Sequence, residues 1–408
     1  MRASHVRGLV QLATQAVAGA TRIVEGVHQS VWTTLGFAGG EPGTTTRGLT
    51  GLVYRGIGGT TRLVGGAADA ALATFEGLSA ADTAHPESPR DIAWRAVLNG
   101  VLGDHLAASG NPLALPMTLH GGDAPLDPCA PHAMAGTSGR ILLRIHGLCL
   151  SEIDWSARAD GESDHAAAIA AAHGYDVVDL RYNTGLHVAQ NGRALARLLE
   201  QLVSNWPVPV ESLAILAHSM GGLVARSACH CAREESLAWL RTLQHLAFLG
   251  TPHHGAPLER AGNLVDGLLD STRYTAPFGL LGRMRSAGIT DLRHGHVIDA
   301  DAHGHDRFAR VGDRRAIVPL PEGVSCHAIA AATSARHSTL AERLVGDGLV
   351  PLRSALGRHH DPRRALAFAP ASQWVAWRTG HLQLLRSPAV TRQLLHMLAP
   401  RTPRRASP

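Results

Sequence analysis

Short apolar runs alternate with longer segments of helical spacing between residues 140 and 249, and this is the clearest pattern in the chain. The apolar runs have the length of buried strands, whereas the segments between them repeat apolar residues every three or four positions. The expected strands and helices, in chain order, are 140–145, 163–172, 176–182, 192–204, 213–217, 221–232 and 244–249. This alternation predicts an α/β fold with a mostly parallel sheet and helices on both faces.

Two further helical stripes precede this region, over residues 6–31 and 52–75, with a Gly/Thr/Pro-rich break at 39–46. We expect residues 1–80 to form an amphipathic helical hairpin, either packed on itself and its neighbours or associated with a membrane surface. Residues 81–137 are expected to hold one helix, which begins after Ser88 and ends near Asn111, and a Gly/Pro-rich loop over 120–139.

Candidate chemistry is concentrated where the expected strand 213–217 ends. Residues 217–222 read Ala-His-Ser-Met-Gly-Gly, with small residues two before and two after Ser219. Such spacing permits a tight strand-to-helix turn that holds the serine hydroxyl above the sheet, at the N-terminus of the next helix. Ser219 is therefore the candidate nucleophile, although a simple turn serine would share this local sequence.

A candidate acid and base follow Ser219 in the order that this type of site requires. Asp347 lies in Gly-Asp-Gly-Leu-Val-Pro after one expected strand (326–332), and His381 follows another (373–377). The carboxyl ends of parallel strands are where active-site residues of open α/β sheets gather. We expect His381 to act as the base and Asp347 to orient it. The apolar residues after His381 (Leu382, Leu384 and Leu385) are expected to begin a helix. The alternative acids are Glu342 and Asp361.

The expected strand 140–145 ends in His146-Gly147, a place suited to an oxyanion donor. We expect the backbone N–H groups of Leu148 and Met220 to stabilise a substrate oxyanion, each lowering the activation barrier by roughly 2.7–4 kcal/mol. The residues expected to border the substrate here are His146, Gly147 and His218.

Together these motifs resemble the α/β-hydrolase lipases and esterases with a His-Gly-Leu oxyanion motif. Within them the chain is similar to bacterial relatives of the GPI inositol-deacylase family, and its Gly-Asp-Gly-Leu-Val segment resembles secreted bacterial triacylglycerol lipases. The segments that carry the resemblance are 144–149, 180–185, 217–222, 249–255, 346–351 and 380–381. Ala217 departs from the commonest glycine at its position, and nothing in the chain indicates recognition of a glycan or inositol.

The resemblance covers about residues 138–398 and implies an α/β-hydrolase domain that cleaves carboxylic esters with an apolar acyl group, without a cofactor or metal. An insertion at about 253–320 lacks strand–helix alternation. Its apolar residues either line an acyl pocket as a mobile lid or form the core of a fixed cap. The pocket candidates are Leu268, Phe278 and Leu281. Two other functions fit the same residues: an acyltransferase or thioesterase, and an inactive membrane-associated scaffold.

The composition of the chain limits the kinds of molecule that it is expected to bind. All 38 basic residues are arginine and the net charge is +5, but basic and aromatic residues are not interleaved, so no nucleic acid is expected. Five cysteines, an odd count, favour reduced thiols and a cytoplasmic protein. No apolar run reaches membrane-spanning length, so any membrane association would be peripheral. A metal site is less expected than solvated loop histidines at His294, His296, His303, His305 and Asp306. The Pro/Arg/Ser-rich tail, 399–408, is expected to be disordered.

Overall fold

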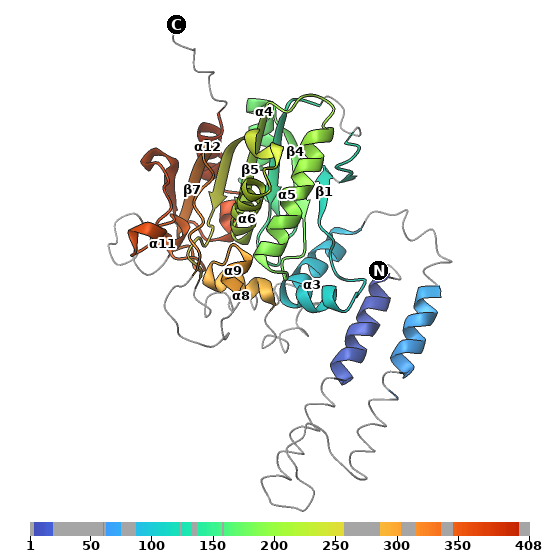
Figure 1. Cartoon of the computed structure of the whole chain (residues 1–408). Coiled ribbons are helices and arrows are strands. Elements are labelled where there is room, and N and C mark those ends of the chain that lie inside the picture. The colour runs from blue at the N-terminus through green and yellow to red at the C-terminus, as the bar shows by residue number, and fades with distance from the viewer. Residues whose placement is uncertain are drawn as a thin grey trace, which may run out of the picture. The chain divides into compact units, whose positions relative to one another are not determined.

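A computed structural model describes most of the chain (Figure 1). The described residues are 4–18, 60, 63–74, 87–122, 124–131, 137–156, 159–256, 286–302, 315–335 and 346–399. The chain divides into two compact units. The first is Met1–Asp91 with Leu106–Ala114, and the second is Ile92–His105 with Leu115–Pro408.

The second unit contains an eight-stranded sheet in the order β2-β1-β4-β3-β5-β6-β7-β8. Strand β1 pairs antiparallel with β2 and β4, and all other neighbours are parallel. The strands are β1 (Thr118–Gly121), β2 (Ala124–Leu126), β3 (Arg140–Ile145), β4 (Asp176–Arg181), β5 (Ser212–His218), β6 (Leu243–Leu249), β7 (Ser325–Ala332) and β8 (Gln373–Trp377). The mostly parallel sheet confirms the predicted α/β-hydrolase fold.

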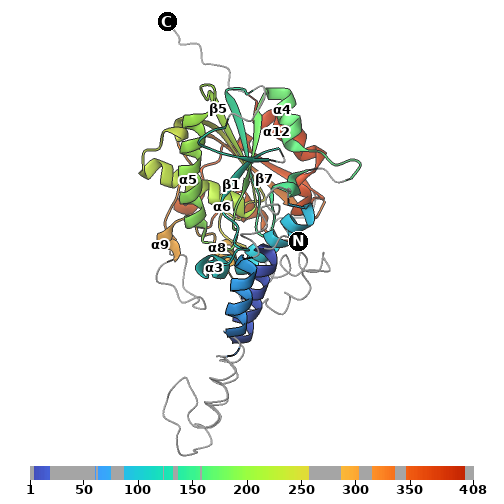
Figure 2. The ribbon, with the colours of Figure 1, turned by 90° about the vertical axis from the view of Figure 1, so that its right-hand side faces the viewer.

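Helices cover both faces of the sheet (Figure 2). Helices α5 (Val188–Asn205) and α6 (Met220–Glu234) lie on one face, and α4 (His165–His173) and α12 (Pro388–Met397) lie on the other. In α5 the buried apolar residues recur at helical spacing, as Val188, Leu195, Leu199 and Leu202. The sheet is thus buried on both sides, which explains why its central strands read as continuous apolar runs rather than alternating ones.

The remaining elements are one long helix, α3, and several short helices and 3₁₀ turns. They are α3 (Pro89–Ala108), η2 (Glu152–Trp155), η3 (Ala238–Arg241), α8 (Ala287–His294), α9 (Asp299–Ala302), α11 (Leu352–Ala355), η5 (Pro362–Arg364), η6 (Pro370–Ser372) and η7 (Leu382–Leu385).

The register of the parallel strands brings their carboxyl ends together. Ile145 of β3 pairs with Ala217 of β5, and Leu249 of β6 pairs with both His218 and Ile329. Trp377 of β8 pairs with Ala332, the last residue of β7. The segments that follow these strands therefore leave the sheet at one edge, where the sequence predicted the functional residues.

Two local predictions were wrong. Residues 120–139 were expected to be a loop, but β1 and β2 begin the sheet there and bury Leu119 and Leu126. Each strand is too short to show two-residue periodicity. The apolar segment after His381 was expected to begin a helix, but it is a 3₁₀ turn, η7. A separate helix begins one turn later at Pro388, which suits a first helical position.

In the first unit, residues 4–18 and 63–74 are helical; the first segment begins two residues before the predicted stripe 6–31, and the second lies within the stripe 52–75. Arg7 and Gln11 of the first segment both contact Asp69 of the second, each at 2.7 Å. The rest of the predicted hairpin, and the tail 400–408, lie outside the described residues. Among the described helices, none combines the length and the apolar character that a bilayer-spanning segment needs.

Candidate active site

Ser219 occupies a strained turn between β5 and α6. Its φ of 54° and ψ of −123° are unusual for a residue with a side chain, and such strain is typical of functional turns. Two hydrogen bonds hold the turn: the Ser219 N–H donates to Leu249 O at 2.8 Å, and the Gly222 N–H donates to Ser219 O at 3.0 Å. The predicted position of the serine, between a buried strand and a helix N-terminus, agrees with this geometry.

The glycines after Ser219 permit a close approach of α6 to neighbouring chain. A Cβ atom on Gly221 would lie 2.5 Å from the carbonyl oxygen of Ile145 and 2.6 Å from that of His146. A Cβ atom on Gly222 would collide with the side chain of Thr251. Small residues are thus required because the helix N-terminus packs directly on the segments that follow β3 and β6.

Asp347 and His381 form a buried hydrogen-bonded pair. His381 Nδ1 donates to Asp347 Oδ2 at 2.6 Å, and the His381 backbone N–H donates to Asp347 O at 3.1 Å. The other carboxylate oxygen, Oδ1, accepts the N–H groups of Leu349 and Val350 at 3.0 and 2.8 Å. An ionised carboxylate only accepts, so this arrangement assigns the proton to Nδ1 and leaves Nε2 as the basic nitrogen.

The glycine-flanked loop that holds Asp347 is fastened to the end of β7. The Thr333 N–H donates to Gly346 O at 3.1 Å, and the Thr379 N–H donates to Ala332 O at 3.0 Å. Gly346 and Gly348 have φ values of 38° and 96°, which favour glycine. The ends of β7 and β8 therefore set the positions of the acid and the base.

Residues 249 and 250 connect the serine side of the site to the histidine side. Leu249 accepts the Ser219 N–H, and the next residue, Gly250, lies against the imidazole of His381. A Cβ atom on Gly250 would lie 3.1 Å from both Cε1 and Nδ1 of that ring. His218 Nε2 also donates to His381 O at 3.2 Å. Ser219 and His381 thus both contact the same short segment, residues 249 and 250.

The segment after β3 packs against the serine. A Cβ atom on Gly147 would lie 3.0 Å from Ser219 Cβ and from His218 Nδ1. Within the described part of the chain, the Leu148 N–H donates to no turn, loop or cap acceptor. Met220 is the first residue of α6, and the N–H groups of a first helical turn have no partner inside the helix. Both predicted oxyanion donors therefore have an N–H suited to that role.

Two of the residues predicted to border the substrate have buried, packed rings. His146 stacks on Tyr182 with ring centroids 4.5 Å apart, and Tyr182 donates its hydroxyl to His146 O at 2.8 Å. The ring of His218 packs edge-on against Trp155. Burial lowers the pKa of both histidines, and the charge of His381 lowers that of His218 further. The two rings are neutral supports of the site, and their contact with substrate stays a prediction.

The alternative acids do not share the position of Asp347. Asp361 caps η5 and pairs with Arg363 at 2.8 Å, and hydrogen bonds from Arg363 lower its pKa to about 2. Glu342 lies outside the described residues. The expected acyl-pocket residues Leu268, Phe278 and Leu281 also lie outside them.

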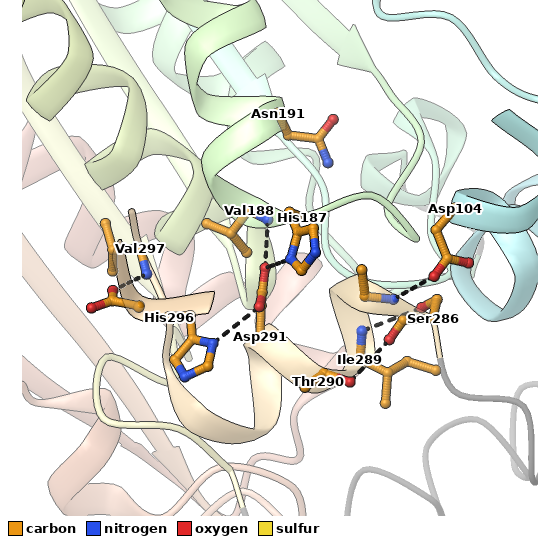
Figure 3. A network of polar contacts seen from close by, with 12 residues as sticks. Asp104, His187, Val188, Asn191, Ser286, Ile289, Thr290, Asp291, His296 and Val297 are labelled. Carbon is orange, nitrogen blue, oxygen red and sulfur yellow. Dashed lines mark hydrogen bonds and ion pairs between the residues drawn. The ribbon is translucent and has the colours of Figure 1, made fainter. Parts of the chain in front are cut away.

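Sequence reasoning missed a polar network that joins α8 to the segments around the site (Figure 3). Asp291 Oδ2 accepts the Val188 N–H at 2.9 Å and His187 Nδ1 at 3.0 Å, while Oδ1 accepts His296 Nδ1 at 3.1 Å. Gly288 packs closely on Met220 and on the carbonyl oxygen of Thr184. Helix α8 thus holds the beginning of α5 and covers an oxyanion candidate, although its sequence shows no motif.

His296 was also a candidate metal ligand. Within the described ranges, no group of three or more histidine, cysteine or acidic residues is arranged to hold a metal ion. His296 instead donates to Asp291, and its ring stacks on His294 at 5.2 Å. The other three candidates, His303, His305 and Asp306, lie outside the described residues.

Comparison with known proteins adds several likenesses. The profile of a family described as a domain of unknown function (DUF7379) matches residues 120–292. A search of the curated proteins gives no match. Among solved structures, the mature lipase BlEst2 of Bacillus licheniformis is similar at 16% identity and a TM-score of 0.42, over 70% of this chain and 98% of that one.

Two esterases are also similar in structure. An esterase of Pyrococcus furiosus matches at 12% identity and a TM-score of 0.36, over 64% of this chain and 81% of that one. A thermophilic esterase of Thermogutta terrifontis matches at 13% identity and a TM-score of 0.34, over 64% and 90% of the two chains. None of these matches is to a GPI inositol-deacylase, so that finer resemblance stays a prediction.

Proposed function

We propose that this protein is a cofactor-free serine hydrolase that cleaves carboxylic esters with an apolar acyl group. The observation that carries the proposal is the buried pair of His381 Nδ1 and Asp347 Oδ2 at 2.6 Å, packed beside the strained Ser219 turn. A nucleophile, a base and an orienting acid in this order are the requirements of acyl transfer through a covalent intermediate.

In the proposed mechanism, Ser219 Oγ attacks the ester carbonyl carbon while His381 Nε2 takes the hydroxyl proton. Asp347 holds the imidazole in the required tautomer and stabilises the imidazolium that forms. The N–H groups of Leu148 and Met220 donate to the tetrahedral oxyanion. His381 then protonates the leaving alcohol, and a water molecule, activated by the same histidine, hydrolyses the acyl-enzyme.

Support for the buried His381–Asp347 pair as a working unit comes from the remaining contacts of the carboxylate. Two backbone N–H groups occupy Asp347 Oδ1, so only Oδ2 is directed to the imidazole. Protein groups surround this pair, which strengthens electrostatic stabilisation of the imidazolium relative to water.

The experiment is a substrate series with purified protein: p-nitrophenyl esters from acetate to palmitate, the matching thioesters, and an ester assayed with a competing alcohol. We expect ester hydrolysis to dominate, with kcat/KM highest for an acyl chain longer than acetyl. Preferential transfer to the alcohol would instead identify an acyltransferase, and preference for thioesters a thioesterase. Absence of turnover on every substrate would favour the inactive scaffold.

A further inference from the structure

Arg226, in the second turn of α6, is buried with most of its hydrogen-bonding capacity unused. Its side chain is only 5% exposed, and Nη2 donates to Val318 O at 2.6 Å. Among the described residues, neither Nε nor Nη1 has a hydrogen-bond partner. A guanidinium keeps its charge in proteins and offers five N–H donors. Each buried N–H donor that lacks an acceptor costs free energy.

Arg226 lines a small cavity of about 30 Å³. His253, another lining residue, is 1% exposed, and neither of its ring nitrogens has a hydrogen-bond partner in the part of the chain that the structure describes. Its ring is fixed between Phe248 and Phe368, with centroids 4.7 and 5.5 Å away. Burial lowers the pKa of His253 well below its ordinary value, so the neutral ring supplies one N–H donor.

The charge around the cavity is positive. Arg226, Arg315 and Arg364 line it, against one carboxylate, Asp301. That carboxylate is already occupied by backbone donors: Oδ2 accepts two N–H groups at 2.9 and 3.2 Å, and Oδ1 accepts the Ala316 N–H at 2.8 Å. Burial, followed by the charge of Arg315, lowers the pKa of Arg226 to about 10. Among the described residues, Arg226 forms no ion pair with this carboxylate, so its own charge lacks a direct counter-ion there.

We propose that the cavity binds one small monovalent anion of chloride size, held by Nε and Nη1 of Arg226 and by a ring N–H of His253. A cavity needs a volume of roughly 10–15 Å³ to hold one buried water. The cavity of about 30 Å³ therefore suits a monatomic anion better than a tetrahedral oxyanion such as sulfate.

The location gives the anion a structural role. It would connect α6, the helix that begins next to Ser219, to the segment after β6 that contains His253 and to the segment before β7 that contains Val318. Bound anion would stabilise the native state by mass action and would fix α6, without taking part in proton transfer. The site does not depend on which ester the protein hydrolyses.

A direct test uses the wild-type protein crystallised in bromide in place of chloride. We expect an anomalous peak in the cavity, within hydrogen-bond distance of Arg226 and His253. A structure with saturating bromide that shows no peak there would overturn the proposal, because water would then be the only occupant.

A solution test measures the melting temperature while chloride replaces gluconate at constant ionic strength. We expect the wild type to gain about 2 °C for each tenfold rise in chloride above Kd. The variant Arg226→Met should lose this response. Arg233→Met, which alters an exposed arginine on the same helix, should keep it. An equal chloride response in Arg226→Met would contradict the site, and failure of that variant to fold leaves the bromide experiment decisive.

Discussion

At the scale of single residues, the proposed chemistry depends on the different hydrogen-bond donors that the two carboxylate oxygens of Asp347 accept. Oδ1 is fixed by the N–H groups of Leu349 and Val350, and Oδ2 accepts from His381. Replacing the carboxylate by an amide keeps the shape but lets a donor face the histidine, which selects the wrong tautomer.

We therefore expect Asp347→Asn to lower kcat about 10⁴-fold, the loss known for such a change in this type of triad. His381→Ala should have a loss of similar size, and combining either with Ser219→Ala should add little because the residues act as a unit. The measurement is steady-state hydrolysis of a short-chain p-nitrophenyl ester. Asp361→Asn is the control, and an Asp347→Asn variant with near wild-type kcat would mean that the acid is misassigned.

Gly250 offers a second test at this scale. Its φ is 58°, and a Cβ atom there would press on the ring of His381. We expect Gly250→Ala to lower kcat roughly 10²-fold while KM changes little, since a small displacement of a catalytic group has an effect of that order. Gly174→Ala is the matched control, because Gly174 has a φ of 69° and open space around it. Equal kcat losses in both variants would show that backbone strain alone is responsible.

The functional residues were predictable from the sequence where chemistry demands a local pattern. Small residues around Ser219 and glycines around Asp347 reveal tight turns, and those turns occur in the structure. The partners of Asp291 were not predictable, because no local spacing links His187 to a residue 104 positions away. Such pairs are set by tertiary packing.

At the scale of elements, one of the contacts that hold α8 is Asp291, a carboxylate that accepts hydrogen bonds from several donors. Burial opposes ionisation of Asp291, but hydrogen bonds from His187 and His296 outweigh it and lower its pKa. The hydrogen bond that His187 donates to Asp291 raises the pKa of His187 above its ordinary 6.5, with smaller contributions from the charges of Asp104 and Asp299.

This pair predicts a pH-dependent stability. Because the pKa of His187 is raised on folding, its contribution is complete below about pH 6.5 and is lost as pH rises through the folded-state pKa. Because the pKa of Asp291 is lowered, its contribution is present above about pH 3.8 and is lost as pH falls through the folded-state value. Both groups are charged between these limits.

We expect the stability advantage of the wild type over His187→Gln to decrease from pH 6 to pH 8, because the buried histidines with lowered pKa contribute in the same way to both proteins. The effect should be below about 1 kcal/mol, since the His187 side chain is 43% exposed and solvent screens the pair. Urea unfolding at several pH values measures it, with the exposed His105→Gln as control. Identical pH profiles in wild type and His187→Gln would exclude this contribution.

Most elements of the sheet were predicted from apolar runs of strand length, with boundaries off by one residue at an end of β4, β6 and β7 and at both ends of β5. The strands β1 and β2, at one end of the sheet, were missed because they have four and three residues. They are placed by pairing, β1 with β4 and β2 with β1, and not by a pattern of their own.

At the scale of the whole molecule, the N-terminal unit and the sheet-containing unit pose separate questions. In the former, the helical segments 4–18 and 63–74 are joined through Asp69, and His5 pairs with Glu87 at 3.2 Å. These contacts favour a packed hairpin. Val17, Leu63 and Val64 are nevertheless exposed on the same two segments.

We expect removal of residues 1–80 to leave hydrolysis of a soluble ester measurable, because Ser219, Asp347 and His381 lie outside them. If the hairpin, whose arginines outnumber its acidic residues, also binds lipid, full-length protein should co-sediment with anionic liposomes at low salt, and less so as salt screens the attraction. Neutral liposomes are the control. No co-sedimentation at low salt would leave only the packing role.

The fold itself brings together residues that are far apart in the chain. Ser219, Asp347 and His381 follow β5, β7 and β8, whose parallel pairing through β6 aligns their carboxyl ends. Strand order could not be read from the apolar pattern, which reports burial but not neighbours. The order of the candidate residues along the chain was the observation that anticipated this arrangement.

The most direct test of the account is covalent labelling of the folded protein by a fluorophosphonate, with the modified residue identified by mass spectrometry. We expect stoichiometric modification of Ser219 and loss of esterase activity in parallel. Ser219→Ala should not be labelled, whereas Ser227→Ala, a buried serine on the same helix, should be labelled like the wild type. Labelling at another serine, or full esterase activity in folded Ser219→Ala, would contradict the central claim.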